Sequence, residues 1–182
     1  GYGGGGAEEV YSSDYSGAVY TKNFIMPDRE SANADKSKLS YENSLNMETL
    51  YVGRNYLLGG NLFKGCTALT FAKVCSDTSS EMFWNCKALT TCVISEDVQN
   101  IATWTFDACS ALQTVIVLGN RVAELSNVNS FGGSGIKQSG GTGKIYVPFA
   151  LLNDYKSATN WSSFASNILA IEDNLGVIGD YL

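Results

Sequence analysis

The chain of 182 residues contains no histidine. Without an imidazole, a Ser-His-Asp triad, a Cys-His pair and a histidine general base are all excluded. The neighbouring carboxylates of Glu96 and Asp97 would point to opposite faces of a strand, so they would not converge on a substrate. We therefore expect that the protein is not an enzyme.

Basic residues and long apolar runs are also scarce. The 12 Lys and Arg are outnumbered by 18 Asp and Glu, and the net charge of −6 argues against a nucleic-acid-binding surface. No apolar run approaches the roughly 18 residues of a membrane span. The chain begins with Gly and shows no signal peptide, which predicts a processed chain or a piece of a longer one. The 45% hydrophobic content instead predicts one folded domain.

One frame recurs from Tyr41 to Val122. Its clearest copy is Leu112-x-x-Val115-x-Val117-x-x-Asn120-x-Val122, and the other copies start at Met47, Leu69 and Leu89. Successive starts lie 22, 20 and 23 residues apart. An aromatic and a small residue stand six and three positions before each start: Tyr41 and Ser44, Phe63 and Cys66, Phe83 and Cys86, Phe106 and Cys109. This period predicts a leucine-rich repeat solenoid.

The frame also predicts which side chains face the core. Positions 4 and 6 alternate with more polar neighbours, which is typical of a strand with one buried face. These positions hold Leu50, Ala72, Cys92 and Val115, then Val52, Val74, Ile94 and Val117. Stacked copies would form a parallel sheet with about 4.8 Å between strands. The aromatic-x-x-small-x-x-Leu spacing predicts a short helical turn on the opposite side, and Asn or Asp at position 9 would satisfy backbone groups in the turn where the chain leaves the strand.

The five cysteines follow the repeat. Cys66, Cys86 and Cys109 share one core position, and Cys92 stands on a strand, where a thiol behaves as a small hydrophobe. The rival interpretation is a disulfide framework or a zinc site, which the absence of any CxxC pair and of histidine disfavours. Cys75, at position 7, is predicted to face solvent. We expect no metal and no cofactor.

Outside the four clear copies the frame loosens. Residues 1–14 read as a flexible glycine-rich lead, and residues 15–40 as an irregular first repeat and loop with Phe24 and Met26 at the strand positions. The repeats extend to residue 147 through a fifth copy starting at Thr142, in which Ile136 and Ser139 replace the aromatic and the small residue. The extra length is a glycine-rich insertion at 131–143, predicted to be an irregular mobile loop. It lacks the Gly and the Ser or Thr that a Walker phosphate loop needs.

The C-terminal region lacks the frame. Residues 148–173 are predicted to form a helical cap, because an uncovered sheet end promotes aggregation. Pro148 would end the last strand, and the spacing of Trp161, Phe164 and Ile168 predicts one face of a helical segment. The tail, residues 174–182, is predicted to be a final strand or the start of another domain.

The motifs NLFKGCTAL, EMFWNCKALTTCVI and WTFDACSALQTVIVL, with the ending IYVP followed by LLNDYKSATNW, resemble the BspA-like leucine-rich repeats of bacterial surface proteins. The resemblance covers about Tyr41 to Asp173. It implies a right-handed solenoid with a parallel sheet on one face, used to bind proteins or cell surfaces, in an extracellular or cell-surface location. Similar repeats also occur in phage structural proteins, so a virion is the alternative location.

Two functions remain open at this point. The first is a protein-binding or adhesion module that uses the outward positions of the strands. These positions would form an exposed apolar and aromatic stripe unless another segment, such as the N-terminal one, covers it. The candidate residues are Tyr51, Phe71, Lys73, Val93, Thr114, Ile116, Leu118 and Tyr146. The second function is a structural or assembly role with self-association.

Overall fold

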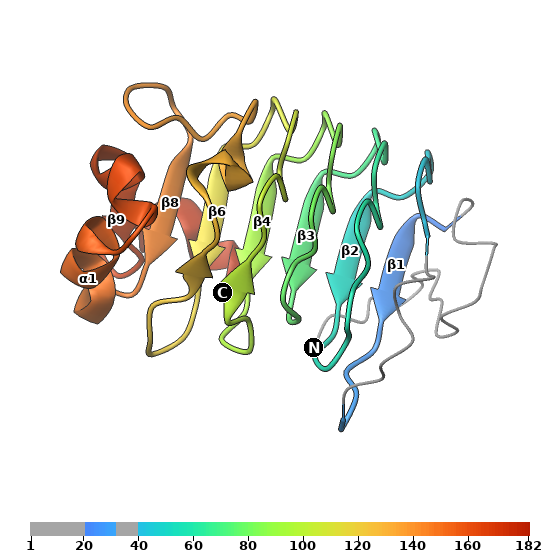
Figure 1. The fold of residues 1–182 in the computed structure, drawn as a ribbon, viewed down its shortest axis with the longest axis horizontal. Coiled ribbons are helices and arrows are strands. Elements are labelled where there is room, and N and C mark those ends of the chain that lie inside the picture. Colours follow the sequence, from blue (N-terminus) through green and yellow to red (C-terminus); the bar gives the residue numbers. More distant parts are fainter. Residues whose placement is uncertain (1–20, 32–39) are drawn as a thin grey trace.

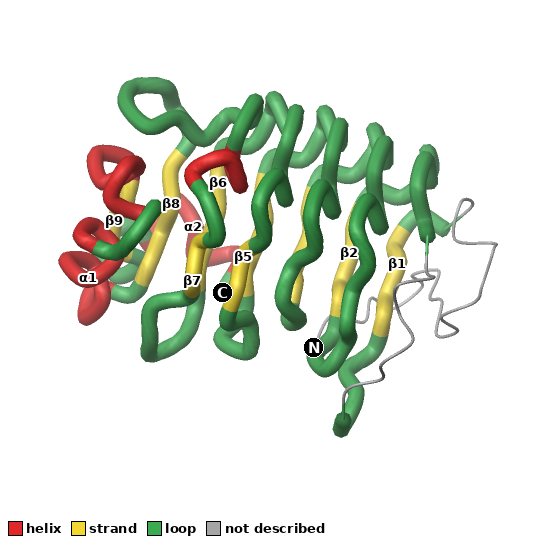
Figure 2. Tube along the Cα trace, in the orientation of Figure 1, coloured by secondary structure: helices red, strands yellow, loops and turns green. Residues whose placement is uncertain are grey.

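The computed structural model describes residues 21–31 and 40–182 of the chain. Seven parallel strands form one sheet in the order β1-β2-β3-β4-β6-β8-β9, and each strand is reached by one coil of the solenoid (Figure 1). Their bounds are β1 Asn23–Met26, β2 Thr49–Val52, β3 Phe71–Val74, β4 Thr91–Ile94, β6 Thr114–Val117, β8 Lys144–Val147 and β9 Ile168–Ala170. The helical segments gather mainly at the C-terminal end (Figure 2). The predicted repeat solenoid with a parallel sheet on one face is confirmed.

The inner face of the sheet is built from like positions of successive coils. Leu50 stands opposite Ala72, Ala72 opposite Cys92, and Cys92 opposite Val115. All four are fully buried, as are their partners at position 6. At the N-terminal end Phe24 and Met26 of β1 extend both rows against Leu50 and Val52. Tyr15 and Ala18, the upstream part of that loose copy, lie outside the described residues.

The side of the solenoid opposite the sheet carries a stack of aromatic rings. The rings of Tyr41, Phe63, Phe83, Phe106 and Phe131 follow one another with centroids 5.7, 5.9, 5.8 and 5.4 Å apart. Their planes differ by no more than 18°. Each turn closes with hydrogen bonds to the third residue back, as from Cys66 N–H to Phe63 O at 3.2 Å. The predicted helical turns are therefore single tight turns.

The cysteine thiols also join successive coils by hydrogen bonds. Cys86 Sγ donates to Phe63 O of the preceding coil at 3.2 Å, and Cys109 Sγ donates to Phe83 O at 3.1 Å. Burial raises the pKa of the Cys109 thiol from 9.0 to about 12 and raises the pKa of Cys92 as well. All five thiols are free and buried. The prediction that Cys75 faces solvent is wrong, since its residue is only 5% exposed.

Along the chain, a small second sheet comes between the strands of the main sheet and the aromatic turns. Strands β5 (Asn100–Ile101) and β7 (Glu124–Leu125) pair in parallel where two longer coils pass each other. Asp77 Oδ1 accepts hydrogen bonds from the backbone N–H groups of Gln99 and Asn100, at 2.7 and 3.2 Å. The predicted backbone role of position 9 is confirmed for Asp77, which acts across coils.

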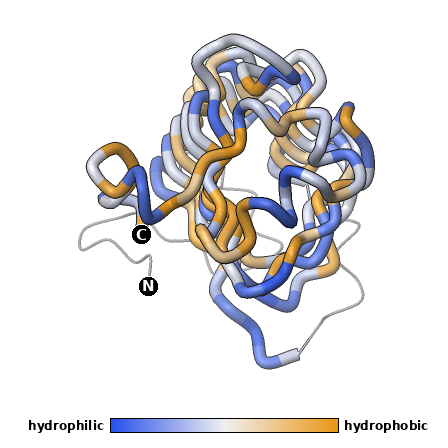
Figure 3. The backbone as a smooth tube through the Cα atoms, turned by 90° about the vertical axis from the view of Figure 1, so that its left-hand side faces the viewer, coloured by the Kyte–Doolittle hydropathy of each residue, from blue (hydrophilic) through white to orange (hydrophobic). Residues whose placement is uncertain are grey.

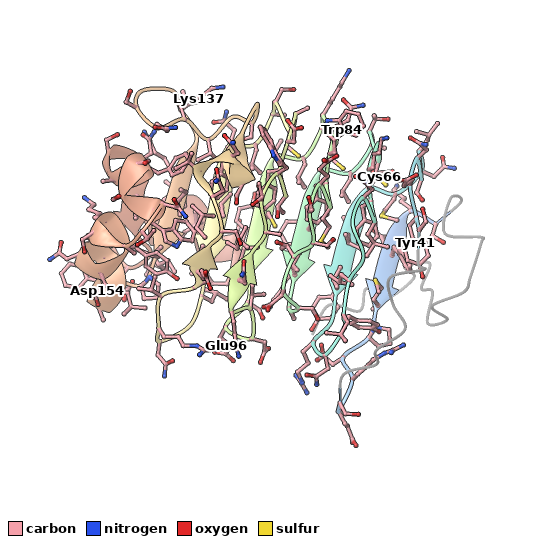
Figure 4. All side chains as sticks on the ribbon, viewed as in Figure 1. Tyr41, Cys66, Trp84, Glu96, Lys137 and Asp154 are labelled. Carbon is pink, nitrogen blue, oxygen red and sulfur yellow. The ribbon has the colours of Figure 1, made fainter. Side chains whose placement is uncertain are left out.

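The glycine-rich segment is only partly an insertion. The 3-10 helix η2 (Val128–Phe131) brings Phe131 onto the aromatic stack, with its ring 5.4 Å from that of Phe106. Ser134, fully in the interior at 1% exposure, takes the place of the small residue. The assignment of these positions to Ile136 and Ser139 is therefore wrong. The exposed loop covers residues 137–142, and Lys137 marks it in Figure 4.

The C-terminal region covers the last coil. It runs through η3 (Phe149–Leu151), α1 (Leu152–Ser157) and η4 (Trp161–Asn167) into β9. Trp161 Nε1–H donates to Ala123 O at 2.7 Å, and Ala123 N–H donates to Tyr155 Oη at 2.9 Å. Ile168, predicted to lie on a helix face, instead begins β9, because its backbone pairs with Ile145 of β8.

The tail, residues 174–182, does not form the strand that was one of its two predicted states. It forms α2 (Leu175–Ile178) and η5 (Gly179–Tyr181). Figure 3 looks along the solenoid and shows this segment outside the ring of coils. Its contacts, described below, place it on the outer face of the sheet.

Candidate partner-binding surface

The outward positions of the strands form rows across the sheet. Tyr51, Lys73, Val93, Ile116 and Tyr146 stand opposite one another in one row, which we call the central row. Phe71 and Thr114 belong to the neighbouring row, and Leu118 follows the end of β6. The structure thus brings all eight candidate residues to the outer face of the sheet.

The C-terminal half of the central row is covered, contrary to prediction. Val93 and Ile116 are 0% exposed and Tyr146 is 6% exposed. They form a second hydrophobic cluster with Ile171 and Ile178. The exposure predicted for these three residues is wrong, because the tail supplies an apolar cover that the repeat pattern does not contain.

The N-terminal half of the outer face keeps accessible surface. Tyr51, Phe71 and Lys73 are all partly exposed, as are Thr114 and Leu118 nearer the tail. Phe71 marks the boundary, since its ring stacks on that of Tyr181 with centroids 5.7 Å apart and planes 15° apart. Tyr51 Oη donates to Asp28 Oδ1 at 2.9 Å. Burial, the Cys75 thiol and the Asp28 carboxylate together raise the pKa of Tyr51.

A hollow of about 390 Å³ lies beside this half, where the chain leaves β2, β3 and β4. The sequence analysis did not predict it. Its lining residues are Arg54, Asn55, Tyr56, Leu57, Cys75, Ser76, Asp77, Asp97 and Gln99. Asn55, Asp77 and Asp97 share position 9 of the frame. Because equal positions of adjacent coils lie side by side, this shared position could have predicted that the three residues line one site.

Charged side chains stiffen one rim of the hollow. Arg54 Nη1 pairs with Asp28 Oδ2 at 3.1 Å, and the Arg29 guanidinium lies 4.3 Å from the centroid of the Tyr56 ring. Both partners of the ion pair are partly exposed, so solvent screens the attraction and the pair contributes little to stability. Its effect is to hold the segment after β1 against the segment after β2.

Within residues 21–31 and 40–182, no group of three or more His, Cys, Asp or Glu side chains could hold a metal ion. The described helices include none with the length and apolar character needed to cross a membrane. The outer face carries apolar and aromatic side chains together with the lysines Lys73 of β3 and Lys144 of β8.

The regular rows, the aromatic stack and the thiol positions agree with a known repeat family. The family model described as "BspA type Leucine rich repeat region (6 copies)" matches residues 37–144, more than half of the chain. The chain belongs to the BspA-type leucine-rich repeat family. A comparison with curated proteins gave no match.

Membership of the BspA-type family indicates a general role. BspA-type leucine-rich repeats occur in surface proteins. The leucine-rich repeat fold generally mediates protein interactions and is generally non-catalytic. The candidate residues that remain accessible on the outer face are Tyr51, Phe71, Lys73, Thr114 and Leu118.

Proposed function

We propose that this domain is a non-catalytic protein-binding or adhesion module of a bacterial cell-surface or secreted protein. Its ligand is a protein or another component of a cell surface, and the outer face of the sheet binds it. The observation that carries the proposal is that the outer face already holds a polypeptide segment, the tail, through apolar contacts with Ile178 and Tyr181. A face that packs one amphipathic segment has the chemistry to pack another.

The N-terminal half of the outer face supports this proposal. Tyr51 offers a ring with a polar hydroxyl and Phe71 offers an apolar ring, and aromatic side chains are enriched in protein interfaces. Lys73 stands between β2 and β4, opposite Tyr51 on one side and Val93 on the other. Its ammonium would pair with a carboxylate or a carbonyl oxygen of the ligand. This bond would fix the orientation of the ligand, which apolar contacts alone do not.

Capture by the immobilised domain tests the proposal. The domain is exposed to purified extracellular-matrix proteins and to cell-surface extracts, and the bound material is quantified for the wild type and for Lys73→Glu. Lys87→Glu is the matched control, because Lys87 is exposed on a turn away from the sheet and undergoes the same change of charge. Loss of capture with Lys73→Glu alone supports the proposal. Equal capture by both variants would reject the outer face as the binding surface.

A structural or assembly role is the second candidate. It is favoured by the exposed residues Leu175, Val177 and Leu182 of the tail, which are 53%, 67% and 55% exposed. Such a cluster of exposed apolar side chains favours self-association. Light scattering coupled to size-exclusion chromatography separates the two candidates, since assembly predicts a mass that rises with concentration and a simple binding module predicts a monomer.

A further inference from the structure

The tail crosses the sheet against the order of the repeats. It leaves β9 through Ile171, which packs in the same cluster as Tyr146, and places Ile178 against Val93 and Ile116. Three residues later, Tyr181 reaches Phe71 of β3. The tail therefore covers the central row from β8 to β4 with one aliphatic anchor and touches β3 with one ring.

The tail is held without directional bonds to the strands that it covers. Val177 and Ile178 both donate their N–H groups to Asn174 O, at 2.9 and 3.1 Å, and Leu182 N–H donates to Gly179 O at 3.2 Å. Asn174 Nδ2 donates to Ala170 O at 2.7 Å. Throughout the described part of the chain, the hydrogen bonds recorded for residues 174–182 stay within residues 170–182. Contacts of this apolar kind can be exchanged for similar ones, because no specific acceptor on β4 or β6 is lost.

The tail is also a weak helix by composition. The α2 segment has four residues, and Gly176 lies within it while Gly179 follows at its C-cap. Glycine disfavours the helical state because it loses the most backbone freedom. A Cβ atom added at either glycine would meet nothing within 4 Å, so packing does not require these glycines.

From these observations we infer that the covered part of the central row, Val93, Ile116 and Tyr146, is a docking groove whose built-in occupant is the tail. A partner polypeptide takes the same groove by presenting an aliphatic residue and an aromatic residue three positions later, in place of Ile178 and Tyr181. The tail must leave before such a partner binds. This inference rests on the proposed binding function of the outer face and names the chemistry of its ligand.

A peptide binding experiment on the full chain tests the inference. The probe is a fluorescently labelled peptide of residues 174–182, and its anisotropy is followed on titration with the wild type and with Ile178→Asp. The aspartate removes the anchor, so the opened groove should bind the peptide at least tenfold more tightly than the wild type. A peptide carrying Ile178→Asp should not bind. A peptide carrying Leu175→Asp should bind like the unchanged one, because Leu175 is 53% exposed and is not part of the buried cluster around Ile178.

A second pair of variants keeps the inference testable if the Ile178→Asp chain does not fold. Tyr181→Ala removes only the ring stack and gives a milder opened chain. Gly176→Ala with Gly179→Ala strengthens the tail helix and should weaken peptide binding below that of the wild type. If folded Ile178→Asp and Tyr181→Ala chains, checked by circular dichroism, both fail to bind the peptide, the inference is wrong.

Two further outcomes separate this inference from the proposed function. Peptide binding to the opened chain without capture of any surface ligand would keep the groove and reject the adhesion role. Ligand capture that Ile178→Asp leaves unchanged, with no peptide binding, would keep the binding role and reject the groove. If the wild type forms a dimer that the peptide dissociates, the inferred partner is not another protein. The occupant of the groove would then be a second copy of this chain.

Discussion

The two faces of the same sheet follow different rules. On the inner face, each side chain packs against the equivalent residue of the next coil, as Val52 does against Val74. On the outer face, Val93 and Ile116 pack against Ile178, which belongs to no repeat. A periodic sequence therefore specifies its periodic contacts, because the two residues in contact occupy the same position of successive repeats. The repeat pattern does not predict a contact with a residue, such as Ile178, that lies outside the repeats.

The largest expected effect tests the inner, periodic side. Phe83 is fully buried between the rings of Phe63 and Phe106, with centroids 5.9 and 5.8 Å away. Phe83→Ala should lower the free energy of unfolding by about 3–5 kcal/mol, since it opens a cavity inside a continuous stack. Urea denaturation followed by circular dichroism measures the change.

The control for this variant is Phe149→Ala, because Phe149 is 61% exposed. We expect this control to change the free energy of unfolding by less than about 0.5 kcal/mol. Similar losses in both variants would contradict the view that the stacked rings form the main core.

The second effect concerns pH and the thiols of the periodic side. The pKa of Cys109 rises from 9.0 to about 12 on folding because the thiol is buried. The stability that the protonated thiol contributes is complete below pH 9 and is lost as the pH rises towards 12. At about 1.4 kcal/mol for each pKa unit, we expect a total loss of about 4 kcal/mol from this group once the pH has passed the folded-state pKa.

Cys109→Ser is the matched comparison for the alkaline loss. A serine hydroxyl can still donate to Phe83 O and does not titrate in this range. Urea denaturation at a series of pH values should show a smaller alkaline loss for the serine variant. Parallel profiles for the two proteins would mean that other groups, such as the tyrosines, cause the alkaline unfolding.

The sequence was sufficient for the inner face and insufficient for the outer one, for identifiable reasons. The strand positions and the aromatic-small pair follow from spacing alone, and the structure places Leu50, Phe63 and Cys66 in the core. The fifth copy was misassigned because the aromatic was counted back six residues from Thr142. The inserted loop lies between the aromatic turn and the strand, so the count reached Ile136 instead of Phe131.

The exposure of Ile116 was mispredicted for a different reason. An outward strand position is exposed only if nothing else covers the sheet, and the tail carries no pattern that predicts where it docks. The exposure of Cys75 was mispredicted as well, since its thiol interacts with the Tyr51 side chain of the preceding coil. For Ile116 the missing information was a contact with a segment outside the repeats, and for Cys75 it was a contact between different positions of neighbouring repeats.

The third effect tests the outer, non-periodic contact. Ile178→Ala should lower the free energy of unfolding by about 2 kcal/mol, the low end for a buried aliphatic residue, because the tail can move to fill the space or detach. In the Ile178→Ala background, Tyr181→Ala should then have little further effect, since the tail no longer holds its ring on Phe71.

A double-mutant cycle by urea denaturation measures this coupling between Ile178 and Tyr181. Leu175→Ala is the control, because Leu175 is 53% exposed and should leave stability unchanged. If the losses in free energy of unfolding caused by Ile178→Ala and Tyr181→Ala add strictly, the tail does not detach as one unit. The contacts of the outer face would then be as stable as those of the inner face.

The smallest expected effect asks whether the periodic side is interchangeable from coil to coil. Ala108 adopts a left-handed backbone with φ 59°, and the equivalent residues Gly65 and Gly133 have φ 73° and 69°. A left-handed residue with a Cβ costs about 1–2 kcal/mol, and glycine loses part of this gain through its greater freedom in the unfolded chain. Ala108→Gly should therefore stabilise the protein by about 0.5–1 kcal/mol, measured by urea denaturation. Gly65→Ala should do the reverse, because alanine would carry a Cβ at φ 73° and the Asn43 side chain would have to move away from it. If Ala108→Gly destabilised the protein, equivalent positions would not be interchangeable, and periodicity would specify the core residues without specifying the turns that join them.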